Sequence, residues 1–98
     1  MRGMNILLCC GGQGRAVLFG RVDADPVPGA SVVLYDARMI LYWSAPCGGL
    51  LGLAASGPKE GTRISARVER VIETCWQQCL FVSTEAAARI AGWPTYGG

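Results

Sequence analysis

The sequence predicts one mostly β domain over residues 1–98, with about five strands and two short helices. The expected architecture is a small SH3-like or Sm-like barrel, and a small sandwich is the alternative. Apolar runs rich in β-branched and aromatic residues recur along the chain, breaks rich in glycine and proline separate them, and only two short stretches consist of helix formers. A chain of 98 residues has the size of one ordinary domain.

The N-terminal part predicts two strands. Met4 to Cys10 is a compact apolar run, and it ends at the turn signal of residues 11–14, Gly-Gly-Gln-Gly. Residues 15–22 resume as a second strand. Gly20 lies inside this run, where a glycine indicates a bulge or a sharp bend. A bend of this kind favours a curled sheet, and therefore a barrel.

The middle of the chain predicts an exposed connection over residues 23–30, which concentrate proline, glycine and aspartate. Residues 31–43 are rich in β-branched and aromatic side chains and predict a long bent strand or a hairpin. One or two helical turns are expected over residues 50–56, which stop at a Gly-Pro pair. Residues 62–68 alternate apolar and polar side chains and predict a half-buried strand with an arginine face.

In the last third, residues 71–82 predict either one bulged strand or two short strands. Ser83 is a suitable N-cap for a short helix that continues to Ile90 and stops at Gly92. The tail from residue 93 onward is expected to be irregular unless its aromatic side chains dock on a neighbouring element.

The charge and hydrophobicity of the chain indicate which classes of partner to expect. The net charge of +2 arises from eight arginines and one lysine against seven carboxylates, so the charge does not favour nucleic acid as a partner. Only 16% of residues are charged, which leaves little charge to cover an isolated monomer and favours a homo-oligomer. No apolar run is long enough for a signal-peptide core or a bilayer span, so we expect no membrane association.

The chain contains no histidine, the usual general base, nucleophile activator and metal ligand. We therefore expect no enzyme activity, no catalytic residues and no cofactor. Five cysteines are an odd number and favour a reducing compartment. Cys75 and Cys79 lie four apart in a segment that favours a strand, which separates the sulfurs by about 13 Å. We therefore expect no metal site.

One group of residues indicates binding. Arg38, Tyr42 and Trp43 lie in one segment, and Arg63 and Arg67 lie on a strand expected to pair nearby. Aromatic faces can stack on bases and arginines can grip phosphates. The alternative is that the aromatic side chains fill the core or a subunit interface while the arginines are solvated.

The sequence also resembles a family of small phage and prophage proteins. The shared pattern includes residues 17–22 (VLFGRV), 32–45 (VVLYDARMILYWSA), 50–57 (LLGLAASG), Arg63-Ile-Ser, and residues 71–87. Its most specific part is residues 37–43 followed by the Leu/Ala/Gly stretch. The resemblance covers most of the chain and implies a viral or prophage origin and a β-rich fold, without catalytic residues or a ligand.

Together these observations lead to two expectations. The first is a phage-encoded, oligomeric binding protein of the host cytoplasm, which inhibits a host defence system by binding a host protein or sequestering a nucleotide second messenger. The alternative is a structural virion component, such as a minor capsid or decoration protein, whose apolar surface serves lattice contacts. An Sm-like nucleic-acid binder is a third possibility, and its affinity would fall steeply with salt.

Overall fold

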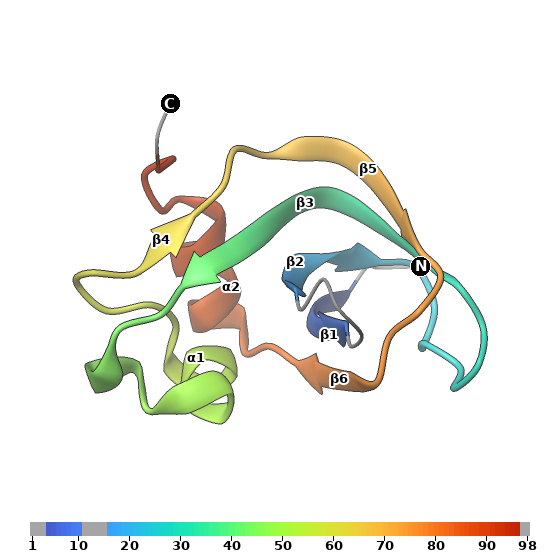
Figure 1. Ribbon diagram of the computed structural model, residues 1–98, viewed down its shortest axis with the longest axis horizontal. Helices are drawn as coiled ribbons and strands as arrows, with labels where there is room; N and C mark the ends of the chain where they lie inside the picture. The colour runs from blue at the N-terminus through green and yellow to red at the C-terminus, as the bar shows by residue number, and fades with distance from the viewer. Residues whose placement is uncertain (1–3, 11–15, 97–98) are drawn as a thin grey trace.

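The computed structural model describes residues 4–10 and 16–96, and it is mostly β, as predicted. The described part contains six strands, two α-helices and one short 3-10 helix, η1 (Figure 1). The elements in chain order are β1 (Met4–Cys10), β2 (Ala16–Val22), β3 (Val32–Tyr42), η1 (Ala45–Cys47), α1 (Gly49–Ser56), β4 (Arg63–Ile64), β5 (Val68–Glu73), β6 (Gln78–Phe81) and α2 (Thr84–Ala91).

The long strand β3 organises an antiparallel sheet. It pairs with β2 along one edge, and along the other edge it pairs first with β5 and then with β4. β1 continues the sheet beyond β2, and β6 lies outside β1. The sheet curls strongly (Figure 1), but β5 and β6 do not pair within the described residues. The sheet is therefore not closed into the barrel that the sequence predicted. It is also one continuous sheet, whereas the alternative, a sandwich, has two packed sheets.

Both faces of the sheet are covered at β1 and β2, where consecutive apolar side chains on opposite faces are buried. One cluster, which includes Leu7, Phe19 and Ile40, packs against the helices. The other, which includes Ile6 and Leu34, fills the inside of the curl. As strand geometry requires, Cys9 packs against the first cluster and Cys10 against the second.

Two local irregularities bend the sheet. The pairing of β2 with β3 shifts register between Phe19 and Arg21, which confirms the predicted irregularity at Gly20. A Cβ atom at this glycine would lie 2.9 Å from Cβ of Leu34, so the strands approach too closely for a side chain. On β3, Asp36 adopts a positive φ of 52° and accepts a 2.6 Å hydrogen bond from Arg21.

The strand predicted over residues 62–68 is wrong in extent, because only Arg63 and Ile64 form β4. At Ser65 a side chain replaces one backbone bond of the ladder. Ser65 N–H donates to the Met39 carbonyl oxygen at 2.9 Å, but Met39 N–H donates to Oγ of Ser65 at 2.8 Å, and this hydroxyl donates to the Ala66 carbonyl oxygen. The chain pairs with β3 again only from Val68, where β5 begins.

The segment predicted as one bulged strand or two short strands forms two, and they lie on opposite edges of the sheet. Residues 74–77 cross from β5 to β6. Within this crossing segment the Trp76 ring nitrogen donates to the Ala30 carbonyl oxygen at 2.7 Å, and Gln77 N–H donates to the Cys9 carbonyl oxygen at 2.8 Å.

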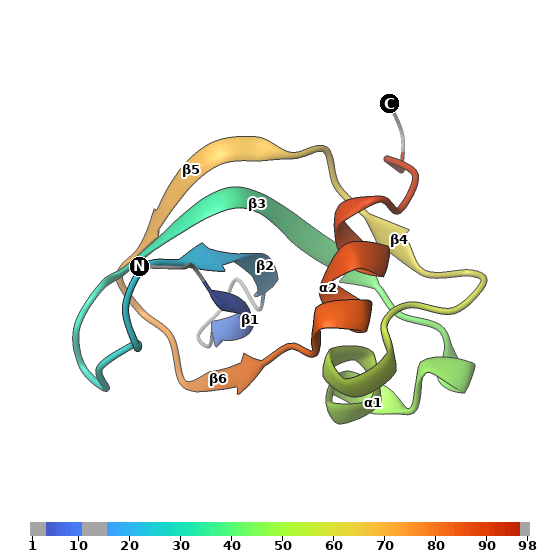
Figure 2. The same cartoon turned by 180° about the vertical axis from the view of Figure 1, so that it is seen from behind.

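The two predicted helices both form and lie together at one end of the sheet (Figure 2). Ser83 caps α2 as predicted, because its Oγ accepts from Ala86 N–H at 3.0 Å. The same hydroxyl donates to the Ala55 carbonyl oxygen of α1, so one side chain joins the two helices. In the described part of the chain, no helix has the length and apolar character of a membrane span.

Candidate binding surface

Arg38 is buried beneath the end of α2. Its Nη1 donates to the carbonyl oxygens of Ile90, Ala91 and Trp93 at 2.8, 3.2 and 2.7 Å. Nε donates to the Ser65 carbonyl oxygen at 2.9 Å, and the side chain is only 3% exposed. The predicted ligand-binding arginine therefore directs most of its donors to the protein's own backbone.

The negative end of a helix is a suitable environment for this cation, because the last carbonyl groups have no partners within the helix. Burial lowers the pKa of Arg38, and the positive charge of Arg67 lowers it further. Arginine offers five N–H groups in a fixed planar fork that spans several carbonyl groups, whereas lysine offers three N–H groups at a single nitrogen atom. Arg38 thus joins β3 to the end of α2.

The C-terminal tail docks on β4. The Trp93 ring nitrogen donates to the Thr62 carbonyl oxygen at 2.9 Å, and its ring packs against the helix-side cluster. Tyr96 N–H donates to the Ile64 carbonyl oxygen at 2.9 Å. Thr95 forms an isolated parallel bridge with Ile64 and accepts from Nη2 of Arg38 at 3.3 Å. The sequence predicted an irregular tail unless its aromatic side chains dock on a neighbouring element, and Trp93 docks in this way.

Docking of the tail completes an aromatic stack around Arg63. The guanidinium carbon lies 5.6 Å from the ring centre of Tyr42 and 4.9 Å from that of Tyr96. Tyr42 and Arg63 are register partners between β3 and β4, which places the two side chains on one face. Both rings are about half exposed, at 52% and 54%. The cation is therefore held between two solvent-facing rings.

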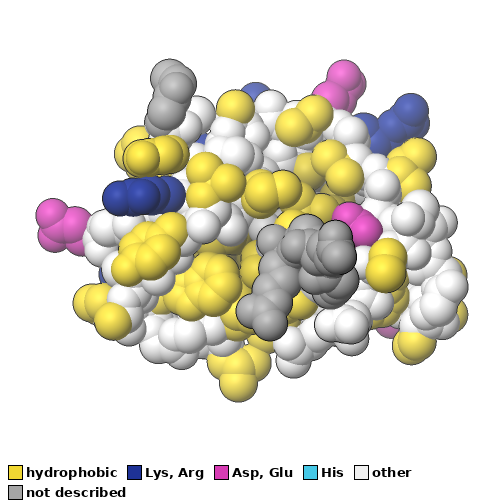
Figure 3. Space-filling model, in the orientation of Figure 1, with side chains coloured by type: hydrophobic (Ala, Val, Ile, Leu, Met, Phe, Trp, Pro, Cys, Tyr) yellow, Lys and Arg dark blue, Asp and Glu magenta, His cyan; other side chains and the backbone are white. Residues whose placement is uncertain are grey.

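Apolar side chains extend this surface along the end of β3. Met39 and Leu41 are 37% and 46% exposed, and Trp43 is half-buried against the helix-side cluster. We call Leu41, Tyr42, Trp43, Arg63 and Tyr96 the aromatic–arginine surface. Figure 3 shows hydrophobic side chains on both sides of a cationic group near the ends of β3 and β4, beside a broader hydrophobic area.

A groove of about 530 Å³ adjoins this surface. Leu41 and Trp43 form part of its wall. The lining is mainly apolar and also includes Cys9, Cys10, Ala16, Val17, Ile40, Leu50 and Gln77. The predicted turn at residues 11–14 lies outside the described residues.

The five predicted site residues thus separate into three groups. Tyr42 and Arg63 meet in the cation–π stack, and Trp43 follows Tyr42 in the chain with its ring packed against the helix-side cluster. Arg38 serves as an internal connector. Arg67 is exposed in the segment between β4 and β5. Its positive charge lowers the pKa of Arg38, and its side chain is not part of the aromatic stack.

The thiols form a separate set of candidate chemical groups. Burial raises the pKa of Cys9 and Cys79, and burial together with Glu73 raises that of Cys10 to about 12. At Cys47 burial acts to raise the pKa, but hydrogen bonds with Thr62, Ser44 and Lys59 N–H outweigh it and lower the pKa. Cys47 is only 4% exposed, so this thiol is shielded from solvent reagents. The described residues contain no metal-binding group of three or more acidic, cysteine or histidine side chains.

Sequence reasoning missed Leu41 and Tyr96 as parts of the surface. Leu41 belongs to a continuous apolar run, in which the register of a single exposed residue cannot be assigned. Tyr96 is distant in sequence from Arg63. The one indication in the sequence was that Tyr96 lies three residues after Trp93, in a tail whose aromatic side chains could dock on a neighbouring element.

Comparison with known proteins gives a family match that covers most of the chain. The profile of a family described as a domain of unknown function, DUF6948, matches residues 3–90. The match spans every strand and nearly all of α2, whereas the tail that carries Tyr96 lies beyond it. No curated protein and no solved structure matches the chain.

Proposed function

Because the chain belongs to the DUF6948 family, whose function is unknown, we propose from its surface that it is a phage-encoded, non-enzymatic binding protein. It inhibits a host defence system by engaging a host protein in the cytoplasm through the aromatic–arginine surface. The observation that carries this proposal is the exposed stack of Arg63 between Tyr42 and Tyr96.

A stacked arginine is suited to protein recognition. Tyr, Trp and Arg are the residue types that dominate interface energetics, and they act best within apolar surroundings that exclude water. Here the two rings limit the movement of the guanidinium before any partner arrives, which reduces the entropy lost on binding. Leu41 supplies an apolar neighbour at 46% exposure.

A host protein suits this surface better than a nucleotide second messenger does. Phosphates are gripped by convergent cations, and Arg38 directs its donors to backbone carbonyl oxygens. Arg67 lies outside the stack, so Arg63 is the only cation within it. The remaining members of the surface are aromatic or aliphatic.

The proposal can be tested in bacteria that carry defined defence systems. We would measure the plaquing efficiency of a sensitive phage in cells expressing the wild-type chain, Arg63→Ala or Tyr96→Ala. Ile72→Ala is the matched control, because this side chain is 59% exposed on β5, away from the stack. The wild type and Ile72→Ala should restore plaquing against at least one system, and both surface variants should reduce this effect at least tenfold.

Calorimetry then separates the two kinds of target. Titration with the purified effector should release heat, whereas a panel of cyclic nucleotides should give none. Strong nucleotide binding that Arg63→Ala abolishes would contradict the protein-binding proposal. Equal activity of Arg63→Ala, Tyr96→Ala and wild type would remove the surface from the mechanism.

A structural virion component is the second candidate. The observation in its favour is that a second exposed apolar area, around Leu51 and Phe81 at 70% and 57% exposure, lies on different elements from the first. Two distinct patches suit the heterologous contacts of a lattice. Mass spectrometry of purified particles distinguishes the candidates, because a lattice protein is present in stoichiometric amounts and an inhibitor is absent.

A further inference from the structure

The outer edge of β6, a strand of four residues, carries neither the charged side chains nor the proline that often protect exposed sheet edges. Residues 76–82, which include the whole strand, contain no charged side chain, no proline and no glycine. β5, at the opposite edge of the sheet, carries Glu69, Arg70 and Glu73. Charges on an edge discourage pairing with another chain, so of these two strands of the described chain β6 is the one more open to such pairing.

The backbone of β6 has groups available for a further strand. Val82 N–H donates to the Asn5 carbonyl oxygen of β1 at 3.0 Å. Alternate residues of an antiparallel strand direct their backbone groups to opposite edges, so those of Leu80 also face β1. The N–H and C=O groups of Cys79 and Phe81 then point outward. Because β6 is the last strand on its side, they face no other strand of the described chain.

A groove lies along this edge. It has a volume of about 350 Å³, and all four residues of β6 line it together with Leu51, Ala54 and Ala55 of α1. Leu51 and Phe81 are among the most exposed large apolar side chains, at 70% and 57%. An incoming strand would therefore meet both unpaired backbone groups and an apolar helix face.

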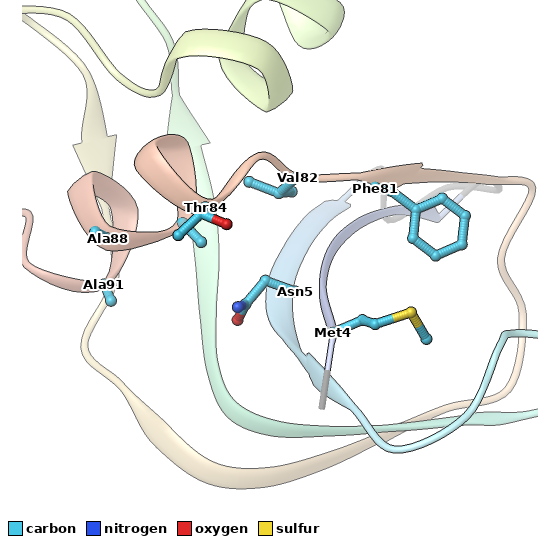
Figure 4. A pocket seen from close by; sticks show the side chains of 8 residues that line it. Met4, Asn5, Phe81, Val82, Thr84, Ala88 and Ala91 are labelled. Carbon is cyan, nitrogen blue, oxygen red and sulfur yellow. The ribbon is translucent and has the colours of Figure 1, made fainter. Parts of the chain in front are cut away.

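The inner side of the strand is also apolar. Figure 4 shows Phe81 and Met4 on one side of β1, with Asn5, Val82 and Thr84 on the other. These residues line a larger groove of about 610 Å³, which continues onto α2. Phe81 thus extends the apolar edge to the inner side of the curl.

From these observations we propose that the β6 edge is a homodimerisation site, at which β6 of a second copy pairs antiparallel. The two-fold axis passes beside Leu80, which faces its own counterpart. Cys79 then lies opposite the partner subunit's Phe81, and their outward groups form four backbone hydrogen bonds across the axis.

A second copy is the occupant because the edge is complementary to itself. The strand is neutral, so pairing of identical strands brings no like charges together. The axis also brings Leu51 of each copy toward the other, which buries a side chain that is otherwise 70% exposed. This site is separate from the aromatic–arginine surface, so dimerisation and partner binding can be tested independently.

The test is the mass of the full chain in solution, measured by light scattering during size-exclusion chromatography over a range of concentrations. The wild type should have about twice the 10.4 kDa of one chain. Phe81→Glu and Leu51→Glu should each weaken dimerisation at least tenfold, because each places two carboxylates near the axis. Ile72→Glu is the matched control on β5 and should remain dimeric, and circular dichroism should show all three variants folded.

Amide hydrogen exchange reports on the edge itself. The amides of Cys79 and Phe81 should exchange slowly in the wild-type dimer and at least tenfold faster in Leu51→Glu. The amide of Leu80 should remain protected in both, because it faces β1.

Three outcomes would overturn the proposal. If the wild-type protein is monomeric at every concentration, it does not form the proposed dimer. If Ile72→Glu dissociates the dimer and Phe81→Glu does not, the dimer interface lies at β5 and not at β6. Protection of Cys79 and Phe81 that appears only after addition of a different protein means that the edge serves another partner.

Discussion

Nη1 of Arg38 lies 2.8 Å from the carbonyl oxygen of Ile90, so a side chain from the middle of β3 closes the end of a helix 52 residues later in the chain. This hydrogen bond is fully buried. It places the most polar group of the predicted site inside the fold, and it makes the position of α2 depend on one guanidinium.

Replacement of Arg38 by alanine should lower the free energy of unfolding by about 3 kcal/mol, because four backbone carbonyl groups lose their hydrogen bonds to the guanidinium, one of them fully buried and three partly buried. Arg38→Lys should recover only part of this loss, since an ammonium group cannot reproduce the planar fork. Urea denaturation measures both changes. Arg89→Ala is the control on the same helix, where an exposed ion pair with Glu85 contributes at most about 1 kcal/mol. Equal losses for Arg38→Ala and Arg89→Ala would contradict this role.

Gly20→Ala should destabilise the fold by about 1–3 kcal/mol, because the new Cβ would lie 2.9 Å from Cβ of Leu34. Thermal unfolding followed by circular dichroism provides the measurement. Gly92→Ala is the matched control, since its nearest neighbour, the Ala88 carbonyl oxygen, would be 3.4 Å away. That variant should stay within about 1 kcal/mol of the wild type. A neutral Gly20→Ala would show that the two strands can separate at little cost.

Ser83→Ala should cost about 1–2 kcal/mol, because the hydroxyl both caps α2 and donates to Ala55 of α1. Ser56→Ala, at the exposed end of α1, should change the stability by less than about 0.5 kcal/mol. The midpoint of chemical denaturation compares the two serines. If both variants are equally stable, the hydroxyl of Ser83 contributes little to either helix.

Alkaline pH should destabilise the protein through Cys10. Its pKa is raised from the ordinary thiol value of 9.0 to about 12 in the folded chain, chiefly by burial and then by Glu73. A raised folded-state pKa stabilises the fold at low pH, and this contribution is lost as the pH rises from about 9 toward 12. Denaturation midpoints should therefore fall more steeply over this range in the wild type than in Cys10→Ala. Parallel curves would indicate that this thiol titrates normally.

Much of the fold could be predicted because the local signals agreed with the tertiary structure. β1 is a compact apolar run followed by glycines, and α2 has a serine cap, an acidic first turn and a terminal glycine. Gly20 marked the bend in β2 because a strand has few other uses for a glycine.

Barrel closure and the second half of the sheet could not be predicted, because they depend on long-range pairing. Residues 62–68 alternate as a strand should, yet Oγ of Ser65 replaces a backbone carbonyl oxygen as the acceptor for Met39 N–H, and β4 ends at Ile64. Nothing local in residues 71–82 reveals that β5 and β6 lie on opposite edges of the sheet.

The candidate site shows the same division. Tyr42 and Arg63 were identified because aromatic and cationic residues on neighbouring strands were expected to meet. Arg38 was included for the same reason, as a cation near aromatic residues. Its main partners are backbone carbonyl groups of residues 90–93, and a pattern of side chains in the sequence cannot predict a contact with the backbone. Tyr96 required knowledge of where the tail docks.

The crossing segment, residues 74–77, limits how flat the sheet can be. A flat sheet would place β5 and β6, which are separated by β3, β2 and β1, about 19 Å apart. The chain from Glu73 to Gln78 spans about 18 Å at full extension, and the contacts of Trp76 and Gln77 keep it from extending fully. A short covalent tether therefore imposes the curvature. Lengthening this tether would let the sheet flatten while its strand order stayed the same.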